Sequence, residues 1–458
     1  MHRVKKLASL LALALLLTAG AAFGQADFSK YVAFGDSLTA GFSSAALLET
    51  YQANSYPALL ARQFGISGFQ QPLVTAPGIG GTPGVGVFTL ARLVPTPVIA
   101  PTPGQGVPKN LTLPRPYDNL GVPGATVHDL LTTKFGGFHN LVLRNTDPNQ
   151  AFTALQEGLS LRPTFVTLWI GNNDALGAAT AGTDQLLTPL ASFEADYRAI
   201  AGAIAASGAK MAIATIPDVT TIPFVTTLTR FIINPATGQP VLLGGNPVPL
   251  IGTQPGDFVL LSATSAEALG FGIPTALGGN GMPLPGSVVL TAAEAANIRT
   301  RVNQYNAVIQ AVASERGAAL VDANAALTEL ATTGVDVGGI IYTSAFLKGG
   351  VFSYDGVHPT RFGYAFLANL FIDAINAKFG TDVEEVNLFP FVFGQSSAAS
   401  SSVQVTADDS EAGPPFVFTD EARRSLLTSL SVPKAYIDGT PPVQAPKPKP
   451  RGHGGRKG

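Results

Sequence analysis

The segment Tyr31-Val32-Ala33-Phe34-Gly35-Asp36-Ser37-Leu38 decides the fold class. Its apolar run at 31–34 is typical of a buried strand in a parallel sheet, and Gly35 ends that run before a turn that carries Ser37. In an open α/β sheet, reacting groups collect at the carboxyl ends of the strands. Ser37 is therefore a candidate nucleophile if a base reaches it. Without a base, this is an ordinary turn with a capping residue.

Beyond this segment, strand-like and helix-like patterns alternate along the chain. This alternation predicts a parallel α/β sheet flanked by helices. Helical spacing at 45–64 follows the Ser37 turn, with a helix start indicated at Tyr56-Pro57 because proline is tolerated at the first helical position. A strand, a turn and a helix entry are expected over 117–127. Further strands are expected at 161–170, 210–216 and 318–322, and further helices at 190–205, 291–316 and 362–379.

The composition limits the classes of function. A chain of 458 residues with 46% hydrophobic content is long enough to bury a large core. The net charge is only −2 and charged residues make up 13%, so no global field favours a nucleic-acid partner. The sequence has no cysteine, which excludes thiol catalysis, disulfides, zinc–thiolate sites and lipoprotein anchoring.

The first 26 residues have the pattern of a secretory signal peptide. A basic start at 2–6 precedes an apolar run at 7–17 that is too short to span a bilayer, and small residues lead to a cleavage site after Ala26. We therefore expect an exported protein that is periplasmic, associated with the outer surface, or secreted.

Proline and glycine divide the rest of the chain. We expect one main α/β domain at 27–380, interrupted by a long proline-rich loop at 71–116 and by an insertion with one or two hairpins at 227–290. The loop is a candidate lid or rim beside Ser37, or structural padding. An extension of unknown role follows at 381–440. The basic stretch 441–458 is expected to be a disordered tail, with peripheral contact to an anionic envelope as one hypothesis.

Four short motifs have complementary chemistry. They are Gly35-Asp36-Ser37-Leu38, the block at Gly124, Gly171-Asn172-Asn173-Asp174, and Asp355-Gly356-Val357-His358. A serine nucleophile needs a base, and histidine suits that role near neutral pH. Asp355 precedes His358 by three residues and is a candidate to orient its imidazole. Acyl transfer also needs donors to an oxyanion, and the N–H groups of Ser37 and Gly124 with the Asn173 amide are candidates.

Together these motifs resemble the SGNH (GDSL-type) hydrolase superfamily, in particular its lipase- and esterase-like members. The resemblance maps the family's serine, glycine, asparagine and histidine onto Ser37, Gly124, Asn173 and His358, with Asp355 as the acid. It implies a flavodoxin-like three-layer sandwich around a five-stranded parallel sheet. It further implies ester hydrolysis through an acyl-enzyme, with no metal or organic cofactor. Gly121 competes with Gly124 for the oxyanion position, and Asp36 and Asp174 are expected to be supporting residues.

Other enzyme classes fit the sequence less well. A dinuclear metallophosphoesterase needs several histidine ligands, but only His358 lies in a motif. An α/β-hydrolase would carry a Gly-x-Ser-x-Gly elbow, which the chain lacks. The expected partner is a small-molecule or lipid ester. An O-acetylated carbohydrate, or a non-catalytic module that binds lipid or glycan, remains the alternative, and the oligomeric state stays open.

Overall fold

The central sheet has five parallel strands, in the order β13-β8-β7-β1-β6. The computed structural model describes residues 26–92, 97–234, 237–393 and 416–440. Numbered by their order in the chain, the five strands run 5-4-3-1-2 across the sheet, which is the flavodoxin-like order read from the other edge. The expected α/β fold is confirmed. The strands are β1 (Tyr31–Gly35), β6 (Asn119–Gly121), β7 (Phe165–Trp169), β8 (Lys210–Ala214) and β13 (Ala319–Val321).

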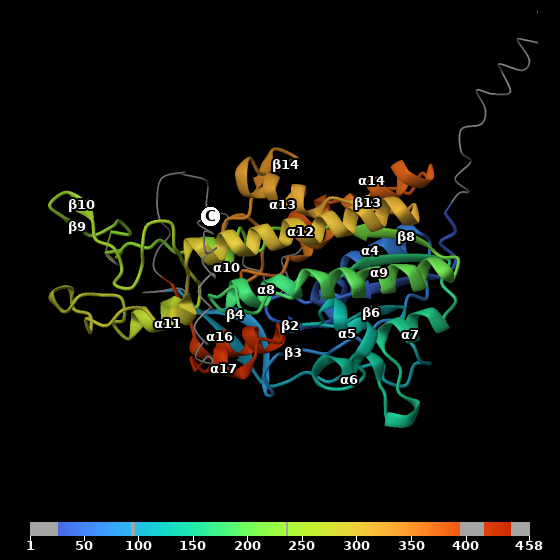
Figure 1. The fold of residues 1–458 in the computed structure, drawn as a ribbon, viewed down its shortest axis with the longest axis horizontal. Helices are drawn as coiled ribbons and strands as arrows, with labels where there is room; N and C mark the ends of the chain where they lie inside the picture. The colour runs from blue at the N-terminus through green and yellow to red at the C-terminus, as the bar shows by residue number, and fades with distance from the viewer. Residues whose placement is uncertain (1–25, 93–96, 235–236, 394–415, 441–458) are drawn as a thin grey trace, which may run out of the picture.

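The sheet has an apolar layer on each face because successive side chains of a strand point to opposite sides. In β1, Tyr31 and Ala33 pack with α4 (Tyr56–Gln63) and α14 (Arg361–Phe379). Val32 and Phe34 pack on the opposite face, in the largest hydrophobic cluster. That face is covered by helices that run along the sheet in Figure 1: α7 (Ala154–Ser160), α9 (Leu190–Ala206) and α12 (Ala292–Arg316).

The helical spacing predicted over 45–64 is interrupted in the structure. A two-residue strand β2 (Ala46–Leu47) comes first, then α3 (Glu49–Gln52), and α4 begins only after Ser55, whose side chain caps it. Ser44 and Ala45 adopt positive φ angles of 49° and 56°, outside the helical region, so no helix begins at 45. Continuous helix over 45–55 was therefore a wrong prediction, whereas the helix start indicated at Tyr56-Pro57 is confirmed.

The segment 71–116, expected to be a long loop, contains a peripheral antiparallel ribbon. The ribbon pairs β4 (Val85–Arg92) with β5 (Val98–Pro103), beside a short β3 (Ile79–Gly80). The prolines exclude this segment from the central sheet, but they are tolerated where a strand has a neighbour on one side only. Pro101 and Pro103 lie beyond the part of β5 that pairs with the C-terminal strand β16 (Val417–Phe418).

The segment 227–290 extends from the sheet edge as a lobe on the left of Figure 1. It carries the hairpin of β9 (Leu242–Leu243) and β10 (Asn246–Pro247), and a pairing of β11 (Phe258–Val259) with β12 (Val289–Leu290). A small hydrophobic cluster around Leu250 holds the lobe together.

The C-terminal region 416–440 is part of the folded body. β16 leads into α16 (Asp420–Ser429) and α17 (Lys434–Ile437), and Phe418 and Leu426 are fully buried in the largest cluster. Almost all of the predicted signal peptide (1–25 of 1–26) and the basic tail 441–458 lie outside the described residues.

Among the described residues, no helix combines the length and apolar character needed to cross a membrane.

The remaining helices and strands complete the layers and loops. These remaining elements are α2 (Ser37–Ala40), α5 (Val127–Thr132), α6 (Gly137–Leu143), α8 (Asn173–Thr180), α10 (Pro223–Thr226), α11 (Ala263–Ala268), α13 (Ala323–Thr332), β14 (Val335–Val337), β15 (Ile340–Tyr342) and α15 (Phe389–Phe393).

Candidate active site

Ser37 is the first residue of the short helix α2, directly after β1. Asp36 caps this helix by accepting the Leu38 N–H at 3.0 Å, and its second oxygen accepts the Asn172 amide at 2.8 Å. Position 35 accepts only glycine without a clash, because a Cβ there would lie 2.3 Å from the Trp169 carbonyl oxygen. The nucleophile candidate is thus fixed at the carboxyl end of the strand, with only 3% of its surface exposed.

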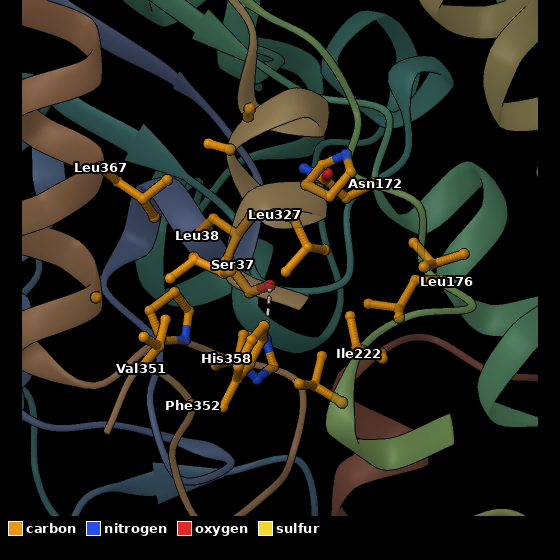
Figure 2. Close-up of a pocket in the computed structure, with 18 of the residues that line it drawn as sticks. Ser37, Leu38, Asn172, Leu176, Ile222, Leu327, Val351, Phe352, His358 and Leu367 are labelled. Atoms are coloured by element: carbon orange, nitrogen blue, oxygen red, sulfur yellow. Dashed lines mark hydrogen bonds between the residues drawn. The ribbon is translucent and has the colours of Figure 1, made fainter. Parts of the chain in front are cut away.

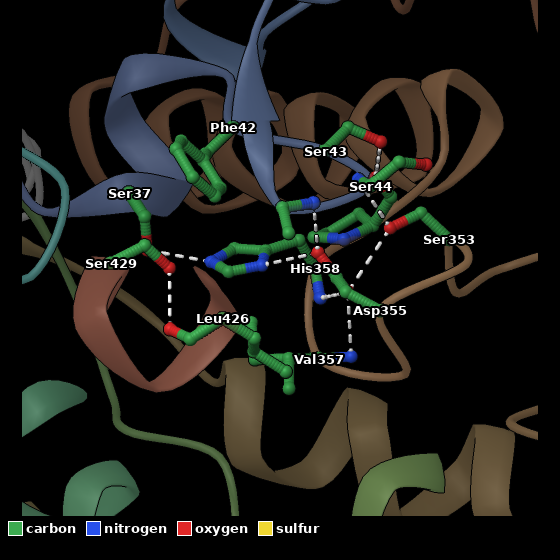
Figure 3. A network of polar contacts seen from close by, with 12 residues as sticks. Ser37, Phe42, Ser43, Ser44, Ser353, Asp355, Val357, His358, Leu426 and Ser429 are labelled. Carbon is green, nitrogen blue, oxygen red and sulfur yellow. Dashed lines mark hydrogen bonds and ion pairs between the residues drawn. The ribbon is translucent and has the colours of Figure 1, made fainter. Parts of the chain in front are cut away.

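Ser37, His358 and Asp355 form a continuous chain of hydrogen bonds (Figure 3). Ser37 Oγ lies 2.9 Å from His358 Nε2, and His358 Nδ1 lies 2.8 Å from Asp355 Oδ2. The serine and histidine are 321 positions apart in the sequence and meet because both lie at the carboxyl edge of the sheet. All three side chains are buried.

Asp355 receives enough donors to remain charged in a buried position. The N–H groups of Val357 and His358 each donate to Oδ1 at 2.8 Å, and the Ala45 N–H donates to Oδ2 at 2.7 Å. Burial by itself would raise the pKa of this carboxyl. The charge and hydrogen bonds of His358 and the neighbouring N–H groups outweigh burial and hold the pKa of Asp355 below its ordinary value.

A strained turn at 43–45 supports this carboxylate, and the sequence analysis did not find it. The positive φ of Ala45 aims its N–H at Asp355, and the Ser44 N–H donates to Ser353 Oγ at 2.8 Å. Ser353 Oγ in turn donates to Asp355 Oδ1 at 3.2 Å. Non-glycine residues in the left-handed region cost energy and persist where the surroundings hold them. The only indication of this turn in the sequence is the pair of small polar residues after Phe42, Ser43 and Ser44.

Gly124 and Asn173, the two further oxyanion candidates, lie beside each other. The Asn173 side-chain amide donates to the Ala125 carbonyl at 2.9 Å, which places it next to the Gly124 turn. Gly124 has a φ of +80°, a conformation that glycine adopts without strain. Gly121, the alternative candidate for the oxyanion donor, is the last residue of β6. A Cβ there would lie 2.3 Å from the Ala40 N, so the close packing of β6 against α2 accounts for a glycine at this position.

Asp36 and Asp174 are buried at the same edge of the sheet. Burial raises the pKa of Asp36 to about 6, against the opposing hydrogen bonds from Asn172 and Leu38. Burial likewise raises the pKa of Asp174 to about 7, although the Val127 N–H donates to it at 3.0 Å. Asp36 connects the Ser37 turn to Asn172, and Asp174 connects the start of α8 to the start of α5.

The family model described as GDSL-like Lipase/Acylhydrolase matches residues 31–371. The chain belongs to the GDSL-like lipase/acylhydrolase family. As a member of that family it is a carboxylic-ester hydrolase. No curated protein matches this sequence.

Several solved structures are similar to this GDSL-family chain. An α/β hydrolase from the metagenome of Lake Arreo, Spain, is 16% identical, with a TM-score of 0.35 over 79% of this chain and 100% of that one. A catalytic mutant of an acetylxylan esterase from Geobacillus stearothermophilus is 14% identical, with a TM-score of 0.34 over 77% and 96%. The lipase/acylhydrolase from Enterococcus faecalis is 16% identical, with a TM-score of 0.31 over 78% and 99%.

The family match ends before the C-terminal region that contacts the site. A Cβ on Gly124 would lie 2.6 Å from the Ser429 carbonyl oxygen and 2.4 Å from Ser431 Oγ. Figure 3 shows Leu426 and Ser429 of α16 in the same view as Ser37, Asp355 and His358. Part of the wall around this GDSL-family site therefore comes from outside the residues that the family model matches.

Within the ranges that the structure describes, no group of three or more histidine, cysteine, aspartate or glutamate residues could hold a metal ion. His128, the nearest histidine to the Gly124 block in the sequence, pairs instead with Asp196 at 2.9 Å on the surface between α5 and α9.

Proposed function

We propose that this GDSL-family chain is an exported serine esterase or lipase in which Ser37, His358 and Asp355 act as a catalytic triad. The observation that carries the proposal is the unbroken hydrogen-bond chain from Asp355 Oδ2 through the imidazole to Ser37 Oγ. The order matches the roles of acid, base and nucleophile in acyl transfer.

The reaction proceeds through an acyl-enzyme. Ser37 Oγ attacks the ester carbonyl carbon and its proton passes to His358 Nε2, while Asp355 balances the charge of the imidazolium. The tetrahedral intermediate then collapses, the carbon–oxygen bond to the alcohol breaks, and the alcohol leaves with the proton from His358. Water then attacks the acyl-enzyme while His358 accepts its proton. His358 returns this proton to Ser37 Oγ as the bond to the acyl group breaks, which releases the carboxylic acid.

The oxyanion is stabilised by the N–H groups of Ser37 and Gly124 together with the Asn173 amide. The hydrogen bond from Asn173 to Ala125 supports this assignment, since it fixes the amide beside Gly124 and leaves a second amide hydrogen to donate. The side-chain oxygen Oδ1 of Asn173 is buried and has no hydrogen-bond partner within the described part of the chain. Unsatisfied buried polar atoms are uncommon and are often found at functional sites.

Export is supported by the basic and apolar pattern at the start of the sequence. The test is fractionation of cells that express the full chain, with sequencing of the mature N-terminus. Cleavage after Ala26 and recovery outside the cytoplasm are expected, whereas an intact N-terminus in the cytoplasm would contradict export.

The hydrolase proposal is tested with p-nitrophenyl butyrate. Replacing Ser37 with alanine removes the nucleophile, so we expect kcat to fall by about 10⁴-fold or more. Ser160→Ala, at the exposed end of α7, is the matched control and should behave like the wild type. A Ser37→Ala variant that retains a tenth of the wild-type rate would contradict the assignment.

A further inference from the structure

A cavity of about 80 Å³ adjoins the reacting side chains (Figure 2). Ser37 and His358 form part of its wall, so the part of an ester that binds inside it lies next to the carbonyl carbon under attack. The remaining walls come from the chain after β7 and β8, from α13, from the 351–359 loop and from the start of α14. Figure 2 shows Leu176 and Ile222 on one side of the catalytic pair and Leu367 on the other.

The polar groups in this wall are already engaged. Among the described residues that line the cavity, four carry a polar side chain: Ser37, Trp169, Asn172 and His358. The Trp169 N–H donates to the Thr215 carbonyl at 3.1 Å, and the Asn172 amide donates to Asp36 at 2.8 Å. Ser37 and His358 bind each other. The cavity therefore offers the acyl side of a substrate little besides hydrocarbon contact.

This lining selects among ester classes. A buried hydroxyl loses its hydrogen bonds to water and must be compensated by protein partners. A carbohydrate in this space would find few such partners. Cavities with an apolar lining offer water few hydrogen-bond partners but bind hydrocarbon. An aliphatic chain therefore fits the cavity better than a sugar does.

Helix α13 supplies one whole wall of the cavity. Ala323, Ala326, Leu327 and Leu330 line it, and their spacing of three, four and seven positions places them on a single helical face. Each of these four side chains is at most 8% exposed, whereas Ala325 on the same helix is exposed. The small side chains of the two alanines leave space in the cavity, and the larger side chains of the two leucines bound it. This face of α13 therefore contributes to the shape of the cavity.

We propose that the α13 face is the binding site for the acyl chain of the substrate, and that the substrates are esters of unbranched aliphatic acids longer than acetate. The inference rests on the proposed function, because the ester carbonyl must lie at Ser37 for its acyl chain to enter this cavity. It assigns chain-length selection to α13.

The wild-type protein provides the first test. With p-nitrophenyl esters from acetate to decanoate, kcat/KM should rise by roughly two- to fourfold for each methylene group buried, until the cavity is full. A decline in kcat/KM from acetate onward would overturn the inference and leave the hydrolase proposal standing. Failure to hydrolyse any member of the series would instead overturn the hydrolase proposal, and this inference with it.

A matched pair of variants provides the second test. Ala326→Leu adds three carbon atoms inside the cavity, whereas Ala325→Leu adds the same atoms on the solvent side of the same helix. We expect Ala326→Leu to lower kcat/KM for the octanoate ester at least tenfold more than for the acetate ester. Ala325→Leu should keep the wild-type chain-length profile.

The variants also distinguish local from global effects. Circular dichroism and the thermal midpoint establish that both fold, and if Ala326→Leu does not fold, the wild-type ester series alone decides the inference. Identical chain-length profiles for the two folded variants would overturn the role of α13. An equal loss on acetate and octanoate in Ala326→Leu would do the same, because it would place the damage at the catalytic groups.

Discussion

Asp355 and Asp174 are both buried at the carboxyl edge of the sheet, yet their surroundings differ in the number of donors. Asp355 accepts hydrogen bonds from the His358 ring, from Ser353 and from three backbone N–H groups. Asp174 accepts the Val127 N–H at 3.0 Å, with a further contribution from Thr188 that does not offset its burial. The pKa of Asp355 is lowered as a result, and the pKa of Asp174 is raised to about 7. Burial alone thus does not decide the charge of a carboxyl here.

The two groups therefore affect stability in opposite directions as the pH changes. A carboxyl whose pKa is lowered on folding contributes stability above its unfolded pKa and loses it as the pH falls. Asp355 belongs to this class. Asp174 binds a proton more tightly when folded, so its contribution is present near pH 4 and is lost as the pH rises toward 7.

In the comparison of the two carboxyls, the largest expected effect comes from Asp355, the acid of the proposed triad. Asp355→Asn keeps the shape of the side chain but removes the charge that orients and balances His358, so kcat should fall by about 10⁴-fold on p-nitrophenyl butyrate. Asp174→Asn is the matched comparison, a buried carboxyl at the same edge that does not contact His358, and should lose far less. Equal losses in the two variants would remove the distinction between the two sites.

The oxyanion side should show the next largest effect. Asn173→Ala removes a side-chain donor and should lower kcat by ~10²–10³-fold with little change in KM. Asn149→Ala, exposed before α7, serves as the control. A loss below tenfold would contradict the assigned role of Asn173.

Asp174 should control part of the pH dependence of stability. The free energy of unfolding, measured with urea between pH 4.5 and 7.5, should decline by on the order of a few kcal/mol more in the wild type than in Asp174→Asn. The proton on Asp174 is lost over this interval in the folded wild type, and the variant has none to lose. Parallel pH profiles for the two proteins would show that Asp174 does not carry the raised pKa.

The smallest expected effect concerns Ser353, which connects Asp355 to the turn at 43–45. Ser353→Ala removes one donor to the carboxylate and one acceptor for the Ser44 N–H. At about 1 kcal/mol for such a bond, kcat should fall about fivefold. Ser160→Ala again provides the control, and a loss as large as that of Asp355→Asn would mean that Ser353 contributes more than support.

The sequence was most informative where chemistry and spacing occur in one short segment. Asp355 and His358 are three positions apart, and Ser37 follows a strand that is recognisable from its apolar run. The fold class followed from the alternation of strands and helices, and the strand order from the family resemblance.

Contacts between distant segments were not predictable in the same way. The Ala45 N–H donates to Asp355, which lies 310 positions later in the sequence. This contact depends on positive φ angles at Ser44 and Ala45, and neither residue type predicts such angles. The α13 face repeats at helical spacing, but nothing in that pattern tells a cavity wall from a core face. The composition of 416–440 also does not predict that this region lies beside Gly124.

The central claim is that Ser37 is the nucleophile activated by His358, and covalent labelling tests it most directly. The full-length folded protein is treated with a fluorophosphonate and digested, and the adduct is located by mass spectrometry. The account predicts one adduct, on Ser37, whose rate of formation collapses in a folded His358→Ala variant. An adduct on another serine, or no adduct on folded wild-type protein, would contradict it.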